Sequence, residues 1–356
     1  MPGMKGLILS GGAGTRLRPI THTSAKQLVP VANKPILFYG LEAMRDAGIS
    51  EVGIVVGDTH AEVEAAVGDG SQFGLTVTYI QQEAPLGLAH AVLIAEEFLA
   101  HEPFVMYLGD NLLKDGIVPF VDSFVASSPD ALILLQKVSD PQSYGIAEID
   151  GGTVVRLVEK PKEPQSDLAL VGVYLFTPAV FDSVKSIRPS WRNELEITDA
   201  IQDMVDRGLR VEPHIVTGWW KDTGKLEDML EANRLILSTL QGDIRGTLDE
   251  TTIEGPVVIG EGSTLRRCTV RGPAIIGAGC TLSDAFVGPY TSIADGVVID
   301  HAEIEHSIIL DECHISYLGA RMTDSLLGKN VTIGQSDARP HAYRFMVGDS
   351  SQIGVV

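Results

Sequence analysis

A repeat in the last third of the chain restricts the fold more than any other feature. Branched apolar residues recur in steps of 6, 6 and 5 positions, three times over, at Ile253, Ile259, Leu265, Val270, Ile276, Leu282, Val287, Ile293, Ile299 and Ile304. The pattern therefore returns every 17 residues. A helix cannot keep a six-residue step on one face, whereas a three-sided solenoid with one short strand per side can. The repeat predicts a solenoid and not a loose β-rich tail.

The repeat resembles the hexapeptide pattern of left-handed parallel β-helices. Small residues such as Gly260, Gly277 and Ala294 often follow the apolar positions. The pattern decays after about residue 315, and residues 335–356 are expected to form an irregular capping tail. We expect a β-helix domain over 241–356 that serves oligomer contacts or regulation, because stacked repeats present long flat faces. Its removal is expected to leave the chemistry of the remaining chain in place.

The first part of the chain, residues 1–240, alternates between strand-like and helical patterns. Continuous apolar runs, typical of strands that are covered on both faces of a sheet, occur at 4–10, 51–57, 75–81, 104–110 and 130–136. Helical spacing occurs at 36–48, 88–100 and 225–240. This alternation predicts an α/β domain with a mostly parallel, Rossmann-like sheet.

Composition and charge exclude several classes of partner. A formal net charge of −20 repels nucleic acid backbones and anionic lipid, so we expect neither nucleic acid nor membrane as a partner. No apolar run reaches membrane-spanning length, and the start of the chain lacks a signal-peptide pattern. Cys268, Cys280 and Cys313 form neither an even framework nor a metal-ligand spacing, which predicts reduced thiols in a cytoplasmic protein. An anionic substrate must then be bound by a local cluster of bases or by a metal.

The stretch LILSGGAGTRLRPIT, residues 7–21, places glycines and arginines directly after a predicted strand. Gly11, Gly12 and Gly14 let backbone N–H groups approach a phosphate chain, because no Cβ stands in the way. The stretch lacks the GK[ST] ending of a Walker P-loop. The spacing of its glycines also differs from that of the dinucleotide-binding fingerprint. Arg16 offers forked donors to phosphate oxygens. Taken alone, the stretch is also compatible with a tight turn that carries solvated arginines.

The full set of motifs resembles the sugar-1-phosphate nucleotidylyltransferase family. The signature GGAGTRLRPIT is followed by a lysine–proline segment, and further matching strings occur in order as QQEAPLGLAHAV (81–92), YLGDN (107–111), YGIAEID (144–150), VEKPKEP (158–164), LVGVYLF (170–176) and WWKDTG (219–224). Together these strings span almost the whole of the first 240 residues. The chain is most similar to the long thymidylyltransferase branch of this family, which carries a β-helical extension.

The resemblance implies transfer of a deoxythymidylyl group from dTTP to glucose 1-phosphate, with Mg²⁺ as the cofactor, and we expect a homo-oligomer. A phosphate oxygen of the sugar phosphate can attack the α-phosphorus directly, so the reaction needs positioning and electrostatics and no side-chain nucleophile. Other readings stay open. These are another nucleotide (UTP, ATP or GTP), another sugar 1-phosphate, a non-catalytic family member, and a second acyltransferase activity that would use His301, His306 or His314 of the β-helix.

The resemblance also assigns roles to individual residues. Arg16 is expected to stabilise the leaving pyrophosphate, Lys26 to contact the phosphates and Lys160 to hold the sugar phosphate. Asp110 and Asp222 correspond to metal-binding aspartates. The residue types agree with this assignment, because Asp110 ends an apolar strand, where open parallel sheets bind ligands, and two carboxylates can share one Mg²⁺.

Two further sets of residues follow from the same resemblance. The set expected around the nucleotide is Leu9, Gly11, Gly12, Gly14, Thr15, Arg16, Gln82, Gly87 and Asp110. The set expected around the sugar phosphate is Leu108, Asn111, Tyr144, Gly145, Glu159, Lys160 and Val171. Within them, Gln82 and Gly87 correspond to base-reading positions, and Glu159 is expected to accept hydrogen bonds from sugar hydroxyls.

Overall fold

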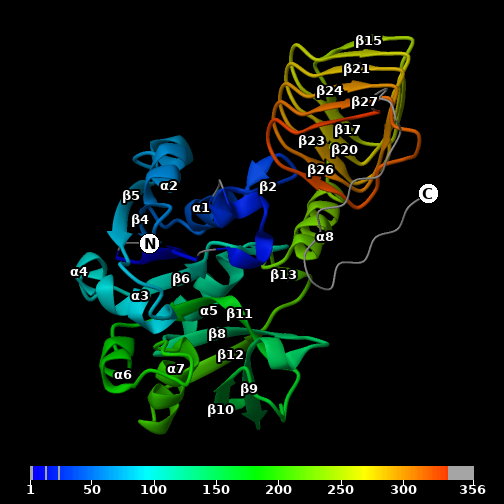
Figure 1. Cartoon of the computed structure of the whole chain (residues 1–356). Helices are drawn as coiled ribbons and strands as arrows, with labels where there is room; N and C mark the ends of the chain where they lie inside the picture. Colours follow the sequence, from blue (N-terminus) through cyan, green and yellow to red (C-terminus); the bar gives the residue numbers. More distant parts are fainter. Residues whose placement is uncertain (1–2, 13, 23–24, 336–356) are drawn as a thin grey trace.

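The computed structural model describes residues 3–12, 14–22 and 25–335. Figure 1 shows an α/β part, coloured blue to green, and a stack of short strands, coloured yellow to red, with helix α8 (Leu226–Leu237) between them. Nearly all of the expected capping tail, 335–356, lies outside the described residues. Within the described ranges, no helix has both the length and the apolar character needed to cross a membrane.

A nine-stranded sheet is the centre of the α/β part. Its parallel portion consists of β6 (Phe104–Leu108), β1 (Lys5–Ser10), β4 (Glu51–Val56) and β5 (Thr76–Gln81), in that order. Strands β1 and β4 are almost entirely buried, as their continuous apolar runs predict. Strand β5 is half exposed, because it forms the edge of the sheet. The predicted Rossmann-like parallel arrangement is confirmed.

Helices cover both faces of this sheet and create two apolar cores. One core contains α1 (Ile36–Asp46), α2 (His60–Val67) and α5 (Val118–Ser127). The other contains α3 (Leu88–Ile94), α6 (Val180–Ser186) and α7 (Ile197–Asp206). Successive residues of β1 point to opposite faces, so that Ile8 joins the first core and Leu7 the second. The helix expected over 88–100 is divided, because α4 (Glu96–Leu99) follows α3 as a separate turn.

Antiparallel strands extend the sheet beyond its Rossmann-like portion. Strand β11 (Leu168–Phe176) pairs antiparallel with β6, and it also borders β8 (Ala131–Lys137) and β9 (Gly145–Asp150). Strand β10 (Thr153–Glu159) pairs with β9, and β12 (Val211–Ile215) runs parallel to β8. The direction of β11 was not foreseeable from its composition. This strand is buried along nearly its whole length, so its apolar run looks like that of a parallel strand.

The last third of the chain forms three sheets of six, six and four short parallel strands. These strands are β14 (Asp243–Ile244), β15 (Thr247–Asp249), β16 (Thr252–Glu254), β17 (Val257–Ile259), β18 (Thr264–Arg266), β19 (Thr269–Arg271), β20 (Ala274–Ile276), β21 (Thr281–Ser283), β22 (Phe286–Val287), β23 (Thr291–Ile293), β24 (Val298–Asp300), β25 (Glu303–Ile304), β26 (Ile308–Ile309), β27 (His314–Ser316), β28 (Leu326–Leu327) and β29 (Thr332–Gly334). The predicted apolar positions from Ile259 to Ile304 are all buried, and Ile253 is partly buried. The β-helix predicted from the repeat is confirmed.

The β-helix is longer than the repeat indicates. Ile293 pairs with Ile309 and Ile309 with Leu327, so the step between coils is 16 residues and then 18. This change hides the 17-residue period after residue 315, although the strands continue to β29. At the other end, α8 ends at Leu237 and β14 begins at Asp243, and we propose that the two domains divide between them.

The inward and outward positions of one β-helix strand give a test of stability. Ile276→Ala removes a fully buried side chain, so we expect the free energy of unfolding to fall by about 2–5 kcal/mol. Ile275→Ala, on the same strand but only partly buried, is the matched control and should cost much less. Urea unfolding followed by circular dichroism measures both. Equal losses would contradict the inward orientation of residue 276.

Candidate active site

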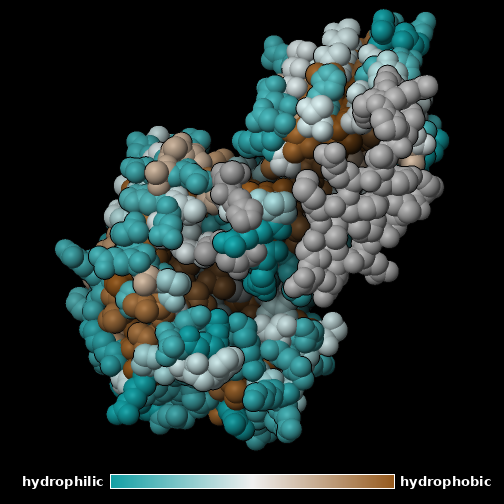
Figure 2. Space-filling view, viewed as in Figure 1, coloured by the Kyte–Doolittle hydropathy of each residue, from teal (hydrophilic) through white to brown (hydrophobic). Residues whose placement is uncertain are grey.

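The carboxyl ends of the parallel strands open onto a cavity of about 220 Å³. It is lined by Leu9, Gly11, Gly12, Gln27, Val55, Gln82, Pro85, Gly87, Leu88, Ala91, Leu108, Asp110 and Glu194. In Figure 2 apolar residues line a hollow in the α/β part, near α3 and β6 of Figure 1. Most of the residues expected at the nucleotide meet in this cavity, together with Leu108 from the sugar-phosphate set. Open parallel sheets bind their ligands at this edge.

Glycine is required at the turn that closes this cavity. Gly87 has a φ of +104°, and a Cβ placed on it would lie 2.4 Å from the carbonyl oxygen of Leu195. Next to this turn, Gln82 Nε2 lies 3.3 Å from the Gly87 carbonyl oxygen and 3.0 Å from His90 Nδ1. The amide of Gln82 is therefore held at the cavity wall by the turn that it borders.

The loop after β1 brings Arg16 beside Asp222. Thr15 and Arg16 lie in a short 3-10 turn, η1 (Thr15–Leu17), which begins after Gly14; the side chain of Thr15 is outside the described part. Arg16 Nη2 lies 2.9 Å from the position that a Cβ on Gly224 would occupy. The Arg16 guanidinium thus packs over the residue two positions after Asp222. Without a glycine at 224 the arginine could not approach so closely.

Asp110 is bound from several sides. Its Oδ2 forms an ion pair with Lys26 Nζ, and its Oδ1 accepts a hydrogen bond from Asn111 Nδ2 at 2.8 Å. Its carbonyl oxygen accepts hydrogen bonds from the Thr223 backbone nitrogen (3.0 Å) and hydroxyl (2.7 Å). Burial acts to raise the pKa of Asp110, but the charge of Lys26 and the hydrogen bonds that the carboxylate accepts from Lys26, Asn111 and its own backbone outweigh it, and the pKa lies below its usual value. Asp110 is therefore an ionised carboxylate at neutral pH.

Asp222 lies beside Asp110, and burial and that neighbouring charge both act against its ionisation. Strand β13 (Trp220–Asp222) pairs antiparallel with β7 (Asn111–Leu113), which places Asp222 opposite Asn111. Burial and repulsion from Asp110 raise the pKa of Asp222 to about 6, although Lys26 and Arg16 act against them. Two adjacent, partly buried carboxylates are a donor set that fits a divalent cation such as Mg²⁺.

Asn111 connects these carboxylates to the aromatic residues of the site. It is buried, and its Oδ1 accepts a hydrogen bond from Trp220 Nε1 at 2.5 Å. The Trp220 ring packs edge-on against Tyr144, with 5.5 Å between the ring centroids. The Asn111 amide thus already bonds to Asp110 and Trp220, which indicates that it holds the site in place. Its contact with the sugar phosphate stays a prediction.

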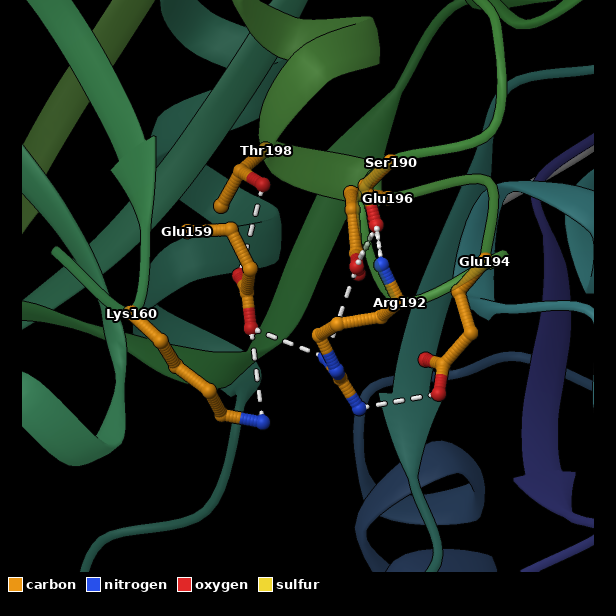
Figure 3. A network of polar contacts seen from close by, with 7 residues as sticks. All are labelled: Glu159, Lys160, Ser190, Arg192, Glu194, Glu196 and Thr198. Atoms are coloured by element: carbon orange, nitrogen blue, oxygen red, sulfur yellow. Dashed lines mark hydrogen bonds and ion pairs between the residues drawn. The ribbon is translucent and has the colours of Figure 1, made fainter.

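Glu159 and Lys160 belong to a network of charged side chains (Figure 3). Glu159 Oε1 lies 3.6 Å from Lys160 Nζ and 3.4 Å from Arg192 Nη1, and its Oε2 accepts a hydrogen bond from Thr198 at 3.3 Å. A Cβ placed on Gly145 would lie 3.1 Å from this oxygen, so glycine keeps the space beside Glu159 open. Burial raises the pKa of Glu159, and Lys160 partly offsets that effect.

The guanidinium at the centre of this network was not predicted from the sequence. Arg192 contacts Glu159, Glu194 and Glu196, and Glu194 also lines the 220 Å³ cavity. Arg192 therefore lies between the residues expected at the nucleotide and those expected at the sugar. The only signal in the sequence was the string WRNELEITD (191–199), in which one arginine stands among acidic residues.

A second missed residue is Gln27, which follows Lys26. It is buried and lines the cavity, and its Oε1 has no hydrogen-bond partner among the described residues. Buried amide oxygens normally have partners, so this one is free to accept a hydrogen bond from a water or a ligand in the cavity. Val171, by contrast, is fully buried in β11, which leaves it at most a backbone or supporting role.

Two of the three β-helix histidines considered for an acyltransferase role, His301 and His306, have ordinary packing partners. His301 Nδ1 lies 2.8 Å from Asp300 Oδ1, and the His301 ring stacks on Tyr317 with 4.8 Å between centroids. His306 packs against Tyr290 at 5.1 Å. These contacts favour packing roles over the acyltransferase alternative.

Comparisons with known proteins agree with the geometry. The sequence model of the family described as "Nucleotidyl transferase" matches residues 5–239. A glucose-1-phosphate thymidylyltransferase from Streptomyces antibioticus is 55% identical over 355 residues, which cover 99% of each chain. The low-salt glycan biosynthesis nucleotidyltransferase Agl11 of Haloferax volcanii is 51% identical over 98% of this chain and 99% of its own.

A solved structure matches about two thirds of the chain. The crystal structure of a Bacillus anthracis protein named as a glucose-1-phosphate thymidylyltransferase, in complex with sucrose, has a TM-score of 0.63 and 37% sequence identity. The match covers 67% of this chain and 98% of the other. The two full-length relatives therefore extend over the β-helix, whereas the solved structure covers about two thirds of the chain.

The raised pKa of Asp222 predicts how stability depends on pH. Below about pH 4 the Asp222 carboxyl is protonated in both the folded and the unfolded chain. Above pH 6 the folded protein must ionise it against burial and against the negative charge of Asp110, and this ionisation lowers the free energy of unfolding. Asp222→Asn should therefore raise the melting temperature of the metal-free protein by a few degrees at pH 8, with the gain shrinking towards pH 4. Differential scanning fluorimetry with a chelator measures it. Asp122→Asn, on the exposed face of α5, is the control; a gain for Asp222→Asn that did not change with pH would contradict the assignment.

Proposed function

Because the chain belongs to the nucleotidyl transferase family, we propose that it transfers a deoxythymidylyl group from dTTP to glucose 1-phosphate and releases dTDP-glucose and pyrophosphate. One observation carries the proposal. The cations Arg16 and Lys26 meet the carboxylates of Asp110 and Asp222 where the strand ends open onto the cavity. The substrates follow from the name of the relative that is 55% identical along the whole chain.

The reaction requires no side-chain nucleophile. A phosphate oxygen of glucose 1-phosphate forms a bond to the α-phosphorus of dTTP, and the bond from that phosphorus to the bridging oxygen of the β-phosphate breaks. The electron pair of the broken bond leaves with pyrophosphate. Since the attacking oxygen is already ionised near neutral pH, no general base is needed, and catalysis consists of positioning and charge stabilisation.

We assign the leaving side of this reaction to the loop after β1. Arg16 can donate two hydrogen bonds to phosphate oxygens, and its position over Gly224 places it beside the carboxylates. Lys26 adds a second positive charge, which Asp110 holds in place. Asp110 and Asp222 would hold Mg²⁺, which supplies positive charge and polarises phosphate oxygens when bound. The raised pKa of Asp222 supports this assignment, because burial and the charge of Asp110 leave its ionised form poorly stabilised and a cation would stabilise it.

We assign the attacking side to the network in Figure 3. Glu159 is positioned to accept hydrogen bonds from sugar hydroxyls, and Lys160 and Arg192 are positioned to bind the sugar phosphate. Gly145 and Tyr144 border the same space from β9 and the turn before it. On the nucleotide side, Gln82 and Gly87 line the far end of the cavity and are assigned to the base.

Two further expectations stay predictions. We propose a cytoplasmic location, and three free, buried cysteines support it because a reducing compartment keeps thiols unpaired. We also propose that the chain assembles into a homo-oligomer, which rests on the flat sides of the β-helix.

Pyrophosphate release should require dTTP, glucose 1-phosphate and Mg²⁺ together, because the two anionic reactants need a shared cation to meet. A coupled pyrophosphate assay with each component omitted in turn measures this. The same assay with four nucleoside triphosphates and several sugar 1-phosphates separates dTTP from UTP, ATP or GTP. Turnover without the sugar phosphate would indicate a phosphatase, and a strong preference for another nucleotide would replace dTTP in the proposal.

Arg16→Ala should lower kcat by about 10²-fold or more, as the loss of one donor to the transition state does. Arg18→Ala is the matched control, because Arg18 is an exposed arginine of the same loop. Steady-state kinetics of pyrophosphate release compare the two variants. A full kcat for Arg16→Ala, or equal losses in both variants, would remove Arg16 from the role assigned to it.

A further inference from the structure

One apolar core joins the β-helix to the catalytic loops. Its buried members are Leu17, Val29, Val31, Ile36, Leu112, Met229, Ala232, Ile308 and Leu310. Leu17 directly follows Arg16, and Leu112 is two residues beyond Asp110. Figure 1 shows the same arrangement, with β2 (Pro30–Val31) and α8 beside the coils that contain β23 and β26. The β-helix therefore packs against the segments that carry the proposed catalytic charges.

Burial along the β-helix marks the face that makes this contact. In β17 and β20 the middle residue points outward and is only partly buried. In β23 all three residues are buried, including the outward-facing Ser292, which pairs in register with Ile275 of β20. A serine hydroxyl buried in this way needs a hydrogen-bond partner, and it finds one outside the β-helix.

The partner of Ser292 is Asn233 on α8, which is only 1% exposed. Asn233 Oδ1 accepts hydrogen bonds from the Ser292 hydroxyl (2.9 Å) and from the Ala32 backbone nitrogen (2.8 Å). Asn233 Nδ2 donates to the Tyr290 carbonyl oxygen at 3.0 Å. One buried amide thus joins the β-helix to the turn between β2 and β3 (Lys34–Pro35). Such a satisfied buried network favours a single geometry.

The same turn makes a second, direct bond to the β-helix. Asn33 Nδ2 donates to the Ile293 carbonyl oxygen at 2.6 Å. Ala32 and Asn33 both have positive φ values, +49° and +59°, so the turn has a defined left-handed geometry. It follows closely on the 3-10 turn η3 (Lys26–Leu28), which contains Lys26. A displacement of the hairpin would therefore be transmitted to the Lys26–Asp110 ion pair.

We propose that Ser292 and Asn33 are positioning residues through which the β-helix fixes the loop that carries Lys26 and Arg16. The proposal rests on the proposed function, because it concerns the geometry of the same reaction. Transfer between two phosphorylated reactants depends on placement to a fraction of an ångström, so a small shift of these cations should lower kcat. The shared core and the two hydrogen-bonded links argue against the expectation that the β-helix can be removed without effect on the chemistry.

The first test compares two buried serines in the full-length protein. Ser292→Ala removes the link to Asn233, whereas Ser307→Ala removes a hydroxyl whose bonds among the described residues go to Glu305 and Ser325, both within the β-helix. We expect similar losses of melting temperature in both variants. Only Ser292→Ala should lower kcat for pyrophosphate release, by about 3- to 10-fold, with the KM for glucose 1-phosphate near its wild-type value.

A second pair keeps the test decisive if a serine variant does not fold. Asn33→Gly retains the left-handed turn between β2 and β3 but loses the bond to Ile293. The control is Asn330→Gly, which makes the same substitution at a left-handed position within the β-helix. We expect lower kcat for Asn33→Gly alone. Wild-type kcat in both Ser292→Ala and Asn33→Gly, or equal losses in the control variants, would overturn the inference. An inactive wild-type protein would instead contradict the proposed function.

Discussion

The ion pair between Lys26 and Asp110 is the contact on which the site depends. It joins the loop after β1 to the end of β6, and it neutralises one of two neighbouring carboxylates. Asp222 must ionise against burial and against the charge of Asp110, and both effects raise its pKa. In the proposed reaction, a divalent cation held by the two carboxylates would stabilise this charge and offset that of the phosphates. Local cations of this kind would let a chain with a net charge of −20 bind two anionic reactants.

The site divides into two electrostatic halves that meet at Arg192. On the side of the loop after β1, the positive charges of Arg16, Lys26 and a bound divalent ion would outnumber the negative charges of Asp110 and Asp222. On the other, a single guanidinium contacts three carboxylates, and these side chains hold it in place beside the cavity. In the proposed reaction, an incoming sugar phosphate would compete with these carboxylates for Arg192 and Lys160. Such competition would discourage the binding of unrelated anions, because a ligand that also satisfies Glu159 would gain more contacts.

The sequence was informative wherever local pattern determines structure. The steps of 6, 6 and 5 located the inward positions of the β-helix, and the apolar run before Asp110 placed that residue at the end of a strand. Long-range contacts were beyond such reasoning. Arg192 meets Glu159 of β10 across 33 residues of sequence, and the role of Asn233 depends on a hairpin 201 residues away. The strand directions around β11 were hidden for the same reason, since burial on both faces erases the alternation that distinguishes sheet types.

The unequal coils near the end of the β-helix show how this architecture accommodates changes in chain length. One coil is a residue shorter than the repeat and the next is a residue longer, yet Ile315 still pairs with Ile299 and Ile333 with Ile315. The corners absorb the difference, so the inward face of each strand is preserved. A deletion or insertion in a corner of such a solenoid is therefore confined to that corner, whereas the same change inside a strand of the Rossmann-like sheet would turn every following side chain to the wrong face.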